Sequence, residues 1–563
     1  METISEVKSN GHLKSKDSIK LKVRQSLLEI QEAYYSGKNK KPLEDLMRAW
    51  KGIKDLPADH PKSFFMLGGF HGEPFRGAGW GNSSYWGGYC NHGNVLFPTW
   101  HRVYVFKLEE ALQSIAGCEE VMLPFWDQTD PESLKNGIPR ALTDENFELD
   151  GVLIPNPLRS FKFPRNITDN ISGDNPNYSK PAGYETVRYP LSGLVGNEEE
   201  IEKTNLHNAK YPNHEENVKI LDANIVDWLT STVINYEGKA ISNSVEKKYE
   251  DCLKAPNYTI FSNTTSAAEW NAQRQTIDPI TGNPIENDPY KKIVSIESPH
   301  NSIHLAVGGF DIPEDGAQLT KIPGANGDMG ENDTAGLDPI FHFHHCNIDR
   351  VFWLWQKKHG FTDHLEIIPE YPGTNTVDNQ GPTPGKAPNS WLTLETTLDP
   401  FKLVEEDRER YYTSLDCINI EKQLGYTYAP GSLEQPTVLE TLAEGYKTKV
   451  IQVSQINKAP IRGSFLISAY AEIDGKVQHI GTEAVLSRWN SKYCANCQTH
   501  IEVKAHFELP VREEHLENGV LKSDIRDSIQ IKILGRDGLL NDDTNELLKS
   551  NGKRPVNYRF DVL

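Results

Sequence analysis

The sequence predicts a multidomain chain in which a mainly α-helical domain with long loops is followed by a β-rich C-terminal domain. Before residue 430, several segments carry apolar residues at the spacing of an α-helix. After it, apolar or alternating runs of strand length dominate. The length of 563 residues allows two to four domains, each large enough to bury a core.

Helices are expected in four segments of the first domain. The first segment covers residues 21–51, and the second begins at Pro98, because proline is favoured in the first helical turn. The other two cover residues 292–306 and 339–358. Residues 130–290 are rich in Pro, Asn and Asp and show few long periodic runs. We therefore expect long ordered loops and insertions in that stretch.

A domain boundary is expected near residues 429–437, APGSLEQPT, where the composition changes. It divides the chain into a loose tail (1–20), the helical domain (21–430) and the β-rich domain (431–563). Five runs of the last domain have the character of strands: KVIQVSQI, GSFLISAYAEI, VQHIGTEAVL, THIEVKAHFEL and IQIKILG.

Charge and composition restrict the class of function. The chain has 59 Lys+Arg and 79 Asp+Glu, a formal net charge of −20, which argues against broad binding to nucleic acids or anionic membranes. No stretch approaches the ~18 apolar residues of a membrane span, and the polar N-terminus lacks the apolar core of a signal peptide. Seven scattered cysteines do not suggest a disulfide framework. We expect a cytoplasmic protein that acts on small molecules.

Histidines carry the strongest chemical signal. His300 and His304 are spaced i, i+4, so both imidazoles project from one helix face. His344 and His345 lie in another predicted helix, beside His342. The zinc-protease pattern HExxH is absent, because asparagine stands in place of its glutamate. Neutral imidazole suits copper, zinc, iron and nickel, so the residues alone predict a histidine-rich metal site between helices. Three more histidines lie around a glycine-rich loop: His71, His92 and His101.

Three motifs extend this interpretation. They are HGN-x3-PTWHR (residues 92–102), H-x3-H (300–304) and DP-x-F-x2-HH-x3-DR (338–350). In these motifs the sequence resembles the tyrosinase family of type-3 copper proteins, particularly the long fungal-type proenzymes. The resemblance implies a four-helix bundle that holds two copper ions, with dioxygen as co-substrate. The implied ligands are His71, His92 and His101 for the first copper, and His300, His304 and His345 for the second.

The resemblance also assigns the residues around the ligands. Cys90 is expected to form a thioether with His92, two residues further on. Glu297 and Asn301 match an acid–asparagine pair that holds a water able to accept a phenol proton. Other motif residues receive structural roles: His344 beside the ligands, Phe341 packed on a ligand imidazole, Asp349 and Arg350 tethering the ligand helix, and Tyr426 and Tyr428 closing the catalytic domain.

The C-terminal domain resembles the family's shielding domain, which covers the active site until proteolysis removes it. By this resemblance Cys494 and Cys497 form, with Cys90, a transient Cu(I) site for copper delivery. The residue at the plug position, where relatives place an aromatic side chain, is Leu486. Two neighbours are alternatives for this plug: Trp489 and Tyr493.

The resemblance implies a tyrosinase, which hydroxylates monophenols at the ortho position and oxidises o-diphenols to o-quinones. The expected partners are small phenols, such as tyrosine or DOPA-like compounds, and an activating protease that cuts near residue 430. Whether the chain forms a homo-oligomer stays open. One alternative is a catechol oxidase or o-aminophenol oxidase without phenol hydroxylation. Two others are a hemocyanin-like oxygen carrier and a protein that binds another metal with only some of the histidines. Glu297 and Asn301 favour the tyrosinase.

Overall fold

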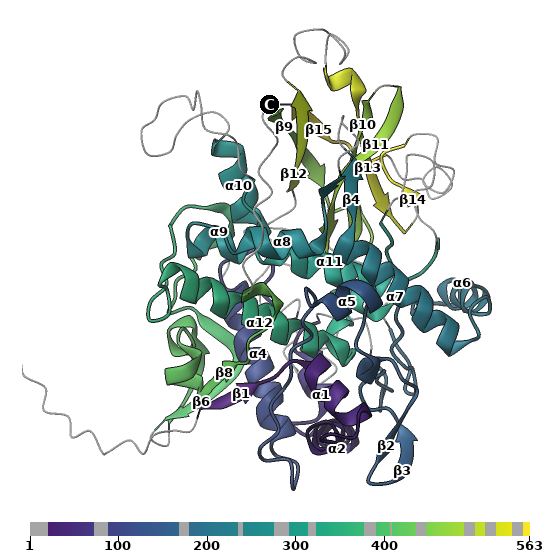
Figure 1. Cartoon of the computed structure of the whole chain (residues 1–563), viewed down its shortest axis with the longest axis vertical. Helices are drawn as coiled ribbons and strands as arrows, with labels where there is room; N and C mark the ends of the chain where they lie inside the picture. The colour runs from purple at the N-terminus through teal and green to yellow at the C-terminus, as the bar shows by residue number, and fades with distance from the viewer. Residues whose placement is uncertain are drawn as a thin grey trace, which may run out of the picture.

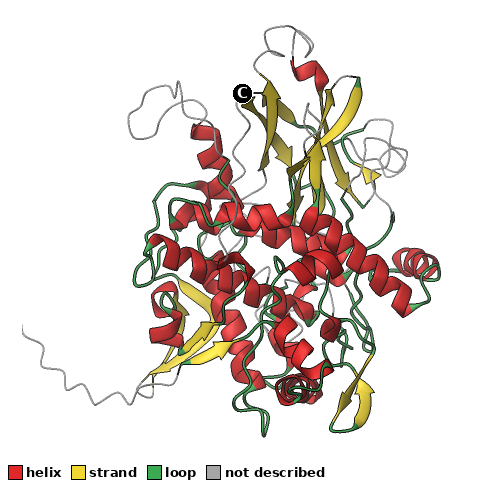
Figure 2. Ribbon diagram, viewed as in Figure 1, coloured by secondary structure: helices red, strands yellow, loops and turns green. Residues whose placement is uncertain are grey.

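A helical body forms the larger part of the molecule, and the C-terminal strands stand against one side of it (Figure 1, Figure 2). This is the predicted order of a mainly helical domain followed by a β-rich region. The predicted tail and the residues Trp489, Tyr493, Cys494 and Cys497 lie outside the described part of the chain. The computed structural model describes residues 21–72, 88–167, 179–234, 240–274, 292–312, 322–375, 390–405, 408–434, 446–473, 475–488, 502–512, 525–536, 538–542 and 555–562.

Three long predicted helices are present in the body. They are α4 (Phe97–Leu112), α11 (Glu297–Gly308) and α12 (Ile340–His359). Pro98 lies in the first turn of α4, as its fixed φ favours. All of α11 is buried, and so is α12 from Ile340 to Gln356, so the polar side chains on these helices need partners inside the protein.

The segment 21–51 is not one helix. It contains strand β1 (Lys22–Arg24), helix α1 (Leu27–Tyr35) and the start of α2 (Lys41–Asp55). Gly37, with φ of +73°, lies in the turn between the two helices, in a conformation that glycine adopts without strain. Strand β1 pairs in parallel with β8 (Tyr426–Tyr428), so the first described residues meet the predicted tyrosine motif.

The expectation of loops over 130–290 was wrong in part. Helix α7 (His214–Thr230) buries Leu221, Ile225, Trp228 and Leu229, a helical spacing that the high polar content of the stretch hid. The structure also has two hairpins here, β2 (Asn146–Leu149) with β3 (Val152–Pro155) and β4 (Thr232–Ile234) with β5 (Ala240–Ser242). The described residues of this stretch also form helices α5 (Pro131–Asn136), α6 (Glu198–Asn208), α8 (Val245–Cys252), α9 (Tyr258–Ser262) and α10 (Thr264–Arg274).

All five predicted C-terminal strands are present. They are β9 (Tyr446–Asn457), β10 (Phe465–Ile473), β11 (Lys476–Val485), β12 (Glu502–Arg512) and β13 (Ile529–Gly535). Two short strands, β14 (Gly538–Leu539) and β15 (Arg559–Val562), were not predicted. One sheet has the order β11-β10-β13-β14 and the other β12-β9-β15. A hairpin of β6 (Thr397–Glu405) and β7 (Arg408–Thr413) precedes them on the helical body.

Two hydrophobic clusters organise the molecule. One fills the helical body from Leu27 to Tyr428, and the other joins the inner faces of the two C-terminal sheets. Leu466, Ala484 and Leu534 of the sheet region belong to the first cluster, so apolar contacts seat that sheet on the helical body. The domain boundary near residue 430 stays a prediction.

Candidate metal centre

The six histidines implied as ligands meet inside the helical body. His101 lies on α4, His300 and His304 on α11, and His345 on α12. His71 follows the short helix α3 (Phe64–Gly69), and His92 lies in the loop before α4. Each copper set therefore draws on a buried helix, which holds its imidazoles rigidly.

In the second set, ring nitrogens converge. The Nε2 atoms of His300 and His304 lie 3.2 and 3.4 Å from Nε2 of His345. Nδ1 of His304 donates to the carbonyl of Met329 at 2.8 Å, and Nδ1 of His300 lies 2.9 Å from Oδ1 of Asn301. With Nδ1 protonated, the Nε2 lone pairs of these two rings face one point, which is the arrangement of a metal site.

The first set has the same design. Nδ1 of His71 donates to the carbonyl of Asn332 at 3.0 Å, and Nδ1 of His101 to that of Phe97 at 2.8 Å. Among the described residues, Nε2 of neither ring has a hydrogen-bond partner. The ring of His92 lies 5.2 Å from that of His71 and 5.1 Å from that of His101, between ring centroids. Buried nitrogens without a partner fit a cation at their centre.

The two sets are neighbours. The rings of His101 and His345 stack with their centroids 4.5 Å apart, and those of His92 and His300 are 5.4 Å apart. Phe341 packs against His345 and His71, one ring of each set, at 4.1 and 4.7 Å. A pair of metal ions held by the two sets would therefore be adjacent.

Burial keeps these imidazoles neutral. It lowers the pKa of His101 to about 3 and that of His304 to about 4. Neutral imidazole is the form that binds a metal, so at neutral pH no proton has to leave before copper binds.

His344 and His345 have different surroundings, although a ring nitrogen of each lies within 4.8 Å of those of His300 and His304. The side-chain amide of Gln128 donates to Nδ1 of His344 at 2.9 Å, and Tyr249 donates to Gln128 at 2.5 Å. His345 instead directs Nε2 at the other two rings of its set. His342, for which the resemblance implies no role, has Nε2 3.1 Å from the carbonyl oxygen of Gly336.

Glu297 is fixed at the edge of the centre. Its Oε1 accepts from the backbone N–H of Gly93 at 2.8 Å. Its Oε2 accepts from the N–H and the hydroxyl of Thr264 at 2.8 and 3.0 Å. Burial raises the pKa of Glu297, against these hydrogen bonds, which lower it. A buried carboxylate with a raised pKa is suited to receive a proton.

A buried ionic network joins two histidine helices. Asp349, on α12, accepts from Nε of Arg102 on α4 at 2.5 Å and from Nη1 of Arg24 on β1 at 3.2 Å. The hydroxyls of Tyr426 and Tyr428 donate to Oδ2 of Asp349 at 2.5 and 2.6 Å, the oxygen that also accepts from Arg24. Because Arg102 follows His101 directly, this network sets the position of α4 relative to α12.

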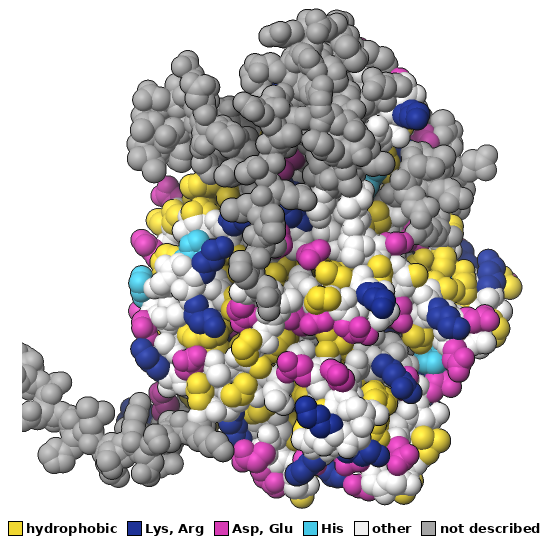
Figure 3. All heavy atoms as spheres, in the orientation of Figure 1, with side chains coloured by type: hydrophobic (Ala, Val, Ile, Leu, Met, Phe, Trp, Pro, Cys, Tyr) yellow, Lys and Arg dark blue, Asp and Glu magenta, His cyan; other side chains and the backbone are white. Residues whose placement is uncertain are grey.

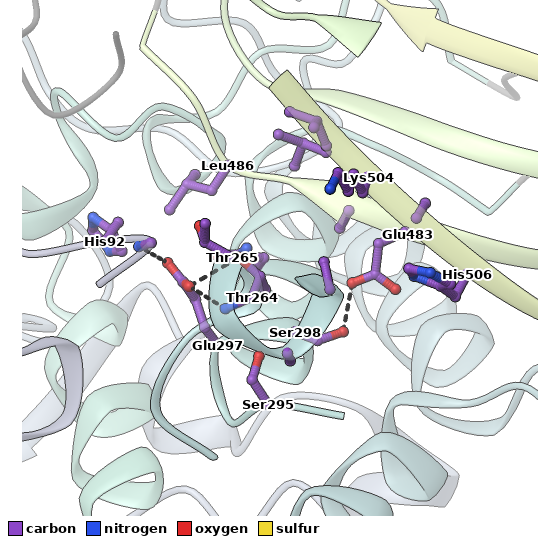
Figure 4. A pocket seen from close by; sticks show the side chains of 18 of the residues that line it. His92, Thr264, Thr265, Ser295, Glu297, Ser298, Glu483, Leu486, Lys504 and His506 are labelled. Atoms are coloured by element: carbon purple, nitrogen blue, oxygen red, sulfur yellow. Dashed lines mark hydrogen bonds between the residues drawn. The ribbon is translucent and has the colours of Figure 1, made fainter. Parts of the chain in front are cut away.

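A cavity of about 450 Å³ opens beside Glu297, between the helical body and the C-terminal sheets. His92, Gly93 and Asn301 line it from the body, and Leu486 and Lys458 from the C-terminal region. In Figure 4, Leu486 lies at the end of the cavity near His92 and Glu297, and Lys504 and His506 lie at the other end. Leu486 is partly buried there and packs against the helical core. The C-terminal region therefore forms one wall of the candidate active site.

Cys90 is buried beside the first set. Its Sγ accepts from the amide of Asn332 at 3.5 Å and from Nη2 of Arg488 at 3.4 Å. The sulfur, His71 and His92 offer ligand atoms within 4.8 Å of one another. The thioether with His92 stays a prediction, as does copper delivery through Cys494 and Cys497.

Known proteins share this sequence and fold. Residues 61–358 match the model described as the common central domain of tyrosinase. A tyrosinase of Hahella sp. (strain CCB-MM4) is 53% identical over 511 residues, which cover 88% of this chain and 89% of that protein. The chain belongs to the tyrosinase family. It is a copper oxidoreductase, and its two histidine sets are compatible with the family's dicopper site.

Two further relatives support the assignment to the tyrosinase family over most of the chain. A tyrosinase of Aspergillus oryzae is 44% identical over 483 residues, which cover 84% of this chain and 87% of that protein. The solved structure of a tyrosinase from Burkholderia thailandensis at low pH has a TM-score of 0.77 and 47% identity. It covers 96% of this chain and 100% of that one, so the C-terminal β region is shared as well.

The visible face of the molecule carries mixed charges. On the face shown in Figure 3, Lys and Arg side chains are interspersed with Asp and Glu. Among the described residues, no helix is both long and apolar enough to cross a membrane.

Sequence reasoning missed the partners that orient the site. Gln128, Thr264, Asn332 and Arg488 belong to no recognised motif and lie far in sequence from the groups that they contact. Nothing in one sequence marks such pairs, because they arise only when the chain folds.

Proposed function

We propose that this chain is a tyrosinase that hydroxylates monophenols and oxidises the resulting o-diphenols to o-quinones. Two copper ions would be held, one by His71, His92 and His101 and one by His300, His304 and His345. When bound, the copper pair supplies the chemistry with dioxygen, and the protein orients the imidazoles, positions the phenol and moves its proton.

The environment of Glu297 carries the proposal. A carboxylate offers about four acceptor sites, and Gly93 and Thr264 fill three of them. The remaining site on Oε1 is available to a water, which the amide of Asn301 would help to orient. Because Glu297 lines the cavity beside His92, such a water would meet the hydroxyl of an entering phenol and pass its proton to the carboxylate.

The cavity suits a single aromatic ring. Its volume of about 450 Å³ lies in the range of small-molecule sites. At one end of it, Glu297 supplies a polar group and Leu486 supplies apolar contact. These features support a small phenol as the substrate.

The test is oxygen uptake by the copper-loaded full-length protein with tyrosine and, separately, with DOPA. Sustained turnover of tyrosine to a quinone is the expected result. Oxidation of DOPA without turnover of tyrosine would establish a catechol oxidase instead. Reversible oxygen binding without turnover of either compound would establish an oxygen carrier.

We further propose that the C-terminal region restrains access to this cavity and that proteolysis near residue 430 relieves the restraint. Leu486 supports this proposal, because it lies at the end of the cavity near His92 and Glu297. Leucine is smaller than the aromatic plug of relatives, so we expect the full-length chain to keep part of its activity. Limited proteolysis that leaves turnover unchanged would contradict this restraint.

A further inference from the structure

A short loop, residues 327–334, lies between α11 and the C-terminal region. Its first N–H, on Gly327, donates to the carbonyl of Gly308 at the end of α11. The backbones approach so closely that a Cβ on Gly308 would lie 1.7 Å from the amide nitrogen of Gly330. The 327–334 loop is therefore seated directly on the helix that carries His300 and His304.

Two carbonyls of this loop orient imidazoles of the candidate metal centre. That of Met329 accepts from Nδ1 of His304 at 2.8 Å, and that of Asn332 accepts from Nδ1 of His71 at 3.0 Å. Each bond selects the tautomer and ring orientation that present Nε2 to a metal. One loop thus supports one histidine of each set.

The acidic side chains of the same loop meet the C-terminal region. Glu331 is paired with Arg536, which follows β13, and Asp333 lies 3.1 Å from Nη1 of Arg488, which follows β11. All four side chains are at most 8% exposed. Buried ion pairs of this kind keep a fixed geometry, because burial of either charge without its partner would be costly in free energy.

Two more contacts join the C-terminal region to the 327–334 loop and to the segment before α4. The N–H of Asn332 donates to the carbonyl of Ser487 at 3.4 Å. Nη2 of Arg488 donates to the sulfur of Cys90, two residues before His92. A single arginine therefore contacts both the loop behind His71 and the segment that carries a second histidine of the first set.

We propose that the C-terminal region is part of the outer support of both copper sites. The pairs Arg536–Glu331 and Arg488–Asp333 hold the 327–334 loop so that its carbonyls keep His304 and His71 in ligating orientation. Because the two acidic residues flank Asn332, loss of either pair releases the backbone that carries a ligand-orienting carbonyl. This inference rests on the proposed ligands and makes both arginines positioning residues.

The experiment compares copper retention in the full-length protein. Arg536→Gln and Arg488→Gln are loaded with copper, reduced, and exposed to excess Cu(I) chelator in the absence of phenol. Loss of an outer partner of a metal ligand typically costs 10–100-fold in metal affinity, so we expect copper release about 10-fold faster than in the wild type. Arg526→Gln is the matched control, since this exposed arginine of the same region pairs with Asp561 at 3.2 Å. Arg536→Lys, which keeps the charge, should retain most of the copper.

Thermal unfolding distinguishes support of the copper ligands from a role of the ion pairs in attaching the C-terminal region to the helical body. We expect each metal-free variant to lose stability, because the substitution leaves a buried carboxylate without its partner. We expect each copper-loaded variant to lose more, because it also gains less stability from copper. Equal loss of stability with and without copper would overturn the proposal, and so would release rates equal to those of Arg526→Gln. Since no phenol is present, failure of tyrosine turnover would leave this test unaffected.

Discussion

At the scale of single residues, the proposed role of Glu297 predicts different effects on phenol hydroxylation and on diphenol oxidation. Glu297→Gln keeps the shape of the side chain and removes its ability to take a proton. Because general-base catalysis contributes about 10²–10⁴-fold, we expect kcat/KM for tyrosine to fall at least about 100-fold and that for DOPA to fall far less. Steady-state oxygen uptake measures both. An equal loss with both compounds would assign Glu297 a structural role only.

The adjacent histidines give a second test at this scale. His345 directs Nε2 at His300 and His304, whereas His344 accepts from Gln128. His345→Ala should therefore bind about half of the wild-type copper. His344→Ala should bind nearly all of it, with lower affinity. Elemental analysis after gel filtration measures copper per chain. Full copper in His345→Ala would contradict the ligand assignment.

The sequence predicted that His300 and His304 share one helix because their spacing is local, and the role of the six histidines as copper ligands stays a prediction. His300 and His304 lie one helical turn apart, and that periodicity is visible without a fold. The hydrogen bonds that select their tautomers involve Met329 and Asn301, one distant and one adjacent. Asn301 was predicted only as a residue that holds a water with Glu297, so neither hydrogen bond was predicted.

At the scale of elements, Asp349 holds α4, α12, β1 and β8 together. Burial raises its pKa, but the Arg102 and Arg24 guanidiniums and the hydroxyls of Tyr426 and Tyr428 outweigh burial, so the pKa lies below the ordinary value. A lowered pKa in the folded state means that Asp349 stabilises the fold above its unfolded pKa, near 3.9. This contribution is lost as the pH falls through the folded-state value.

Asp349→Asn should therefore destabilise the protein at pH 7 by about 3–5 kcal/mol, the cost of breaking a buried ion pair. Its stability should also decline less steeply than that of the wild type as the pH falls below about 4. Denaturant unfolding at several pH values measures both effects. Asp150→Asn is the control, because the Arg48–Asp150 pair is exposed and should contribute only about 0–1 kcal/mol. Equal effects of the two substitutions would contradict this account.

Helices and strands could be predicted where a single periodicity of apolar residues dominates the segment. The strands β9 to β13 and the helices α4 and α12 carry continuous apolar patterns, and all were found near their predicted bounds. Helix α7 was missed because its buried face consists of a few residues between charged ones. Its place is fixed by contacts outside itself, where Asn224 donates to the carbonyls of Ala306 and Phe310.

At the scale of the whole molecule, the two proposals give the C-terminal region opposing effects on one centre. Leu486 and Lys458 line the cavity, where they would restrain entry of a substrate. Arg488 and Arg536 contact the loop behind His71 and His304, where they would support the ligands. Removing the whole region would change both effects together, so single substitutions are needed to separate them.

Leu486→Ala isolates the restraint from the support. Burying a leucine side chain stabilises by about 2 kcal/mol, so its removal should raise kcat/KM of the full-length chain for tyrosine by up to about 30-fold. Copper retention should stay at the wild-type level, because Leu486 is a member of neither arginine pair described above. Val477→Ala, on the exposed part of β11, is the control. Unchanged turnover in Leu486→Ala would show that this side chain does not restrain the site, and copper loss would show that restraint and support are one function.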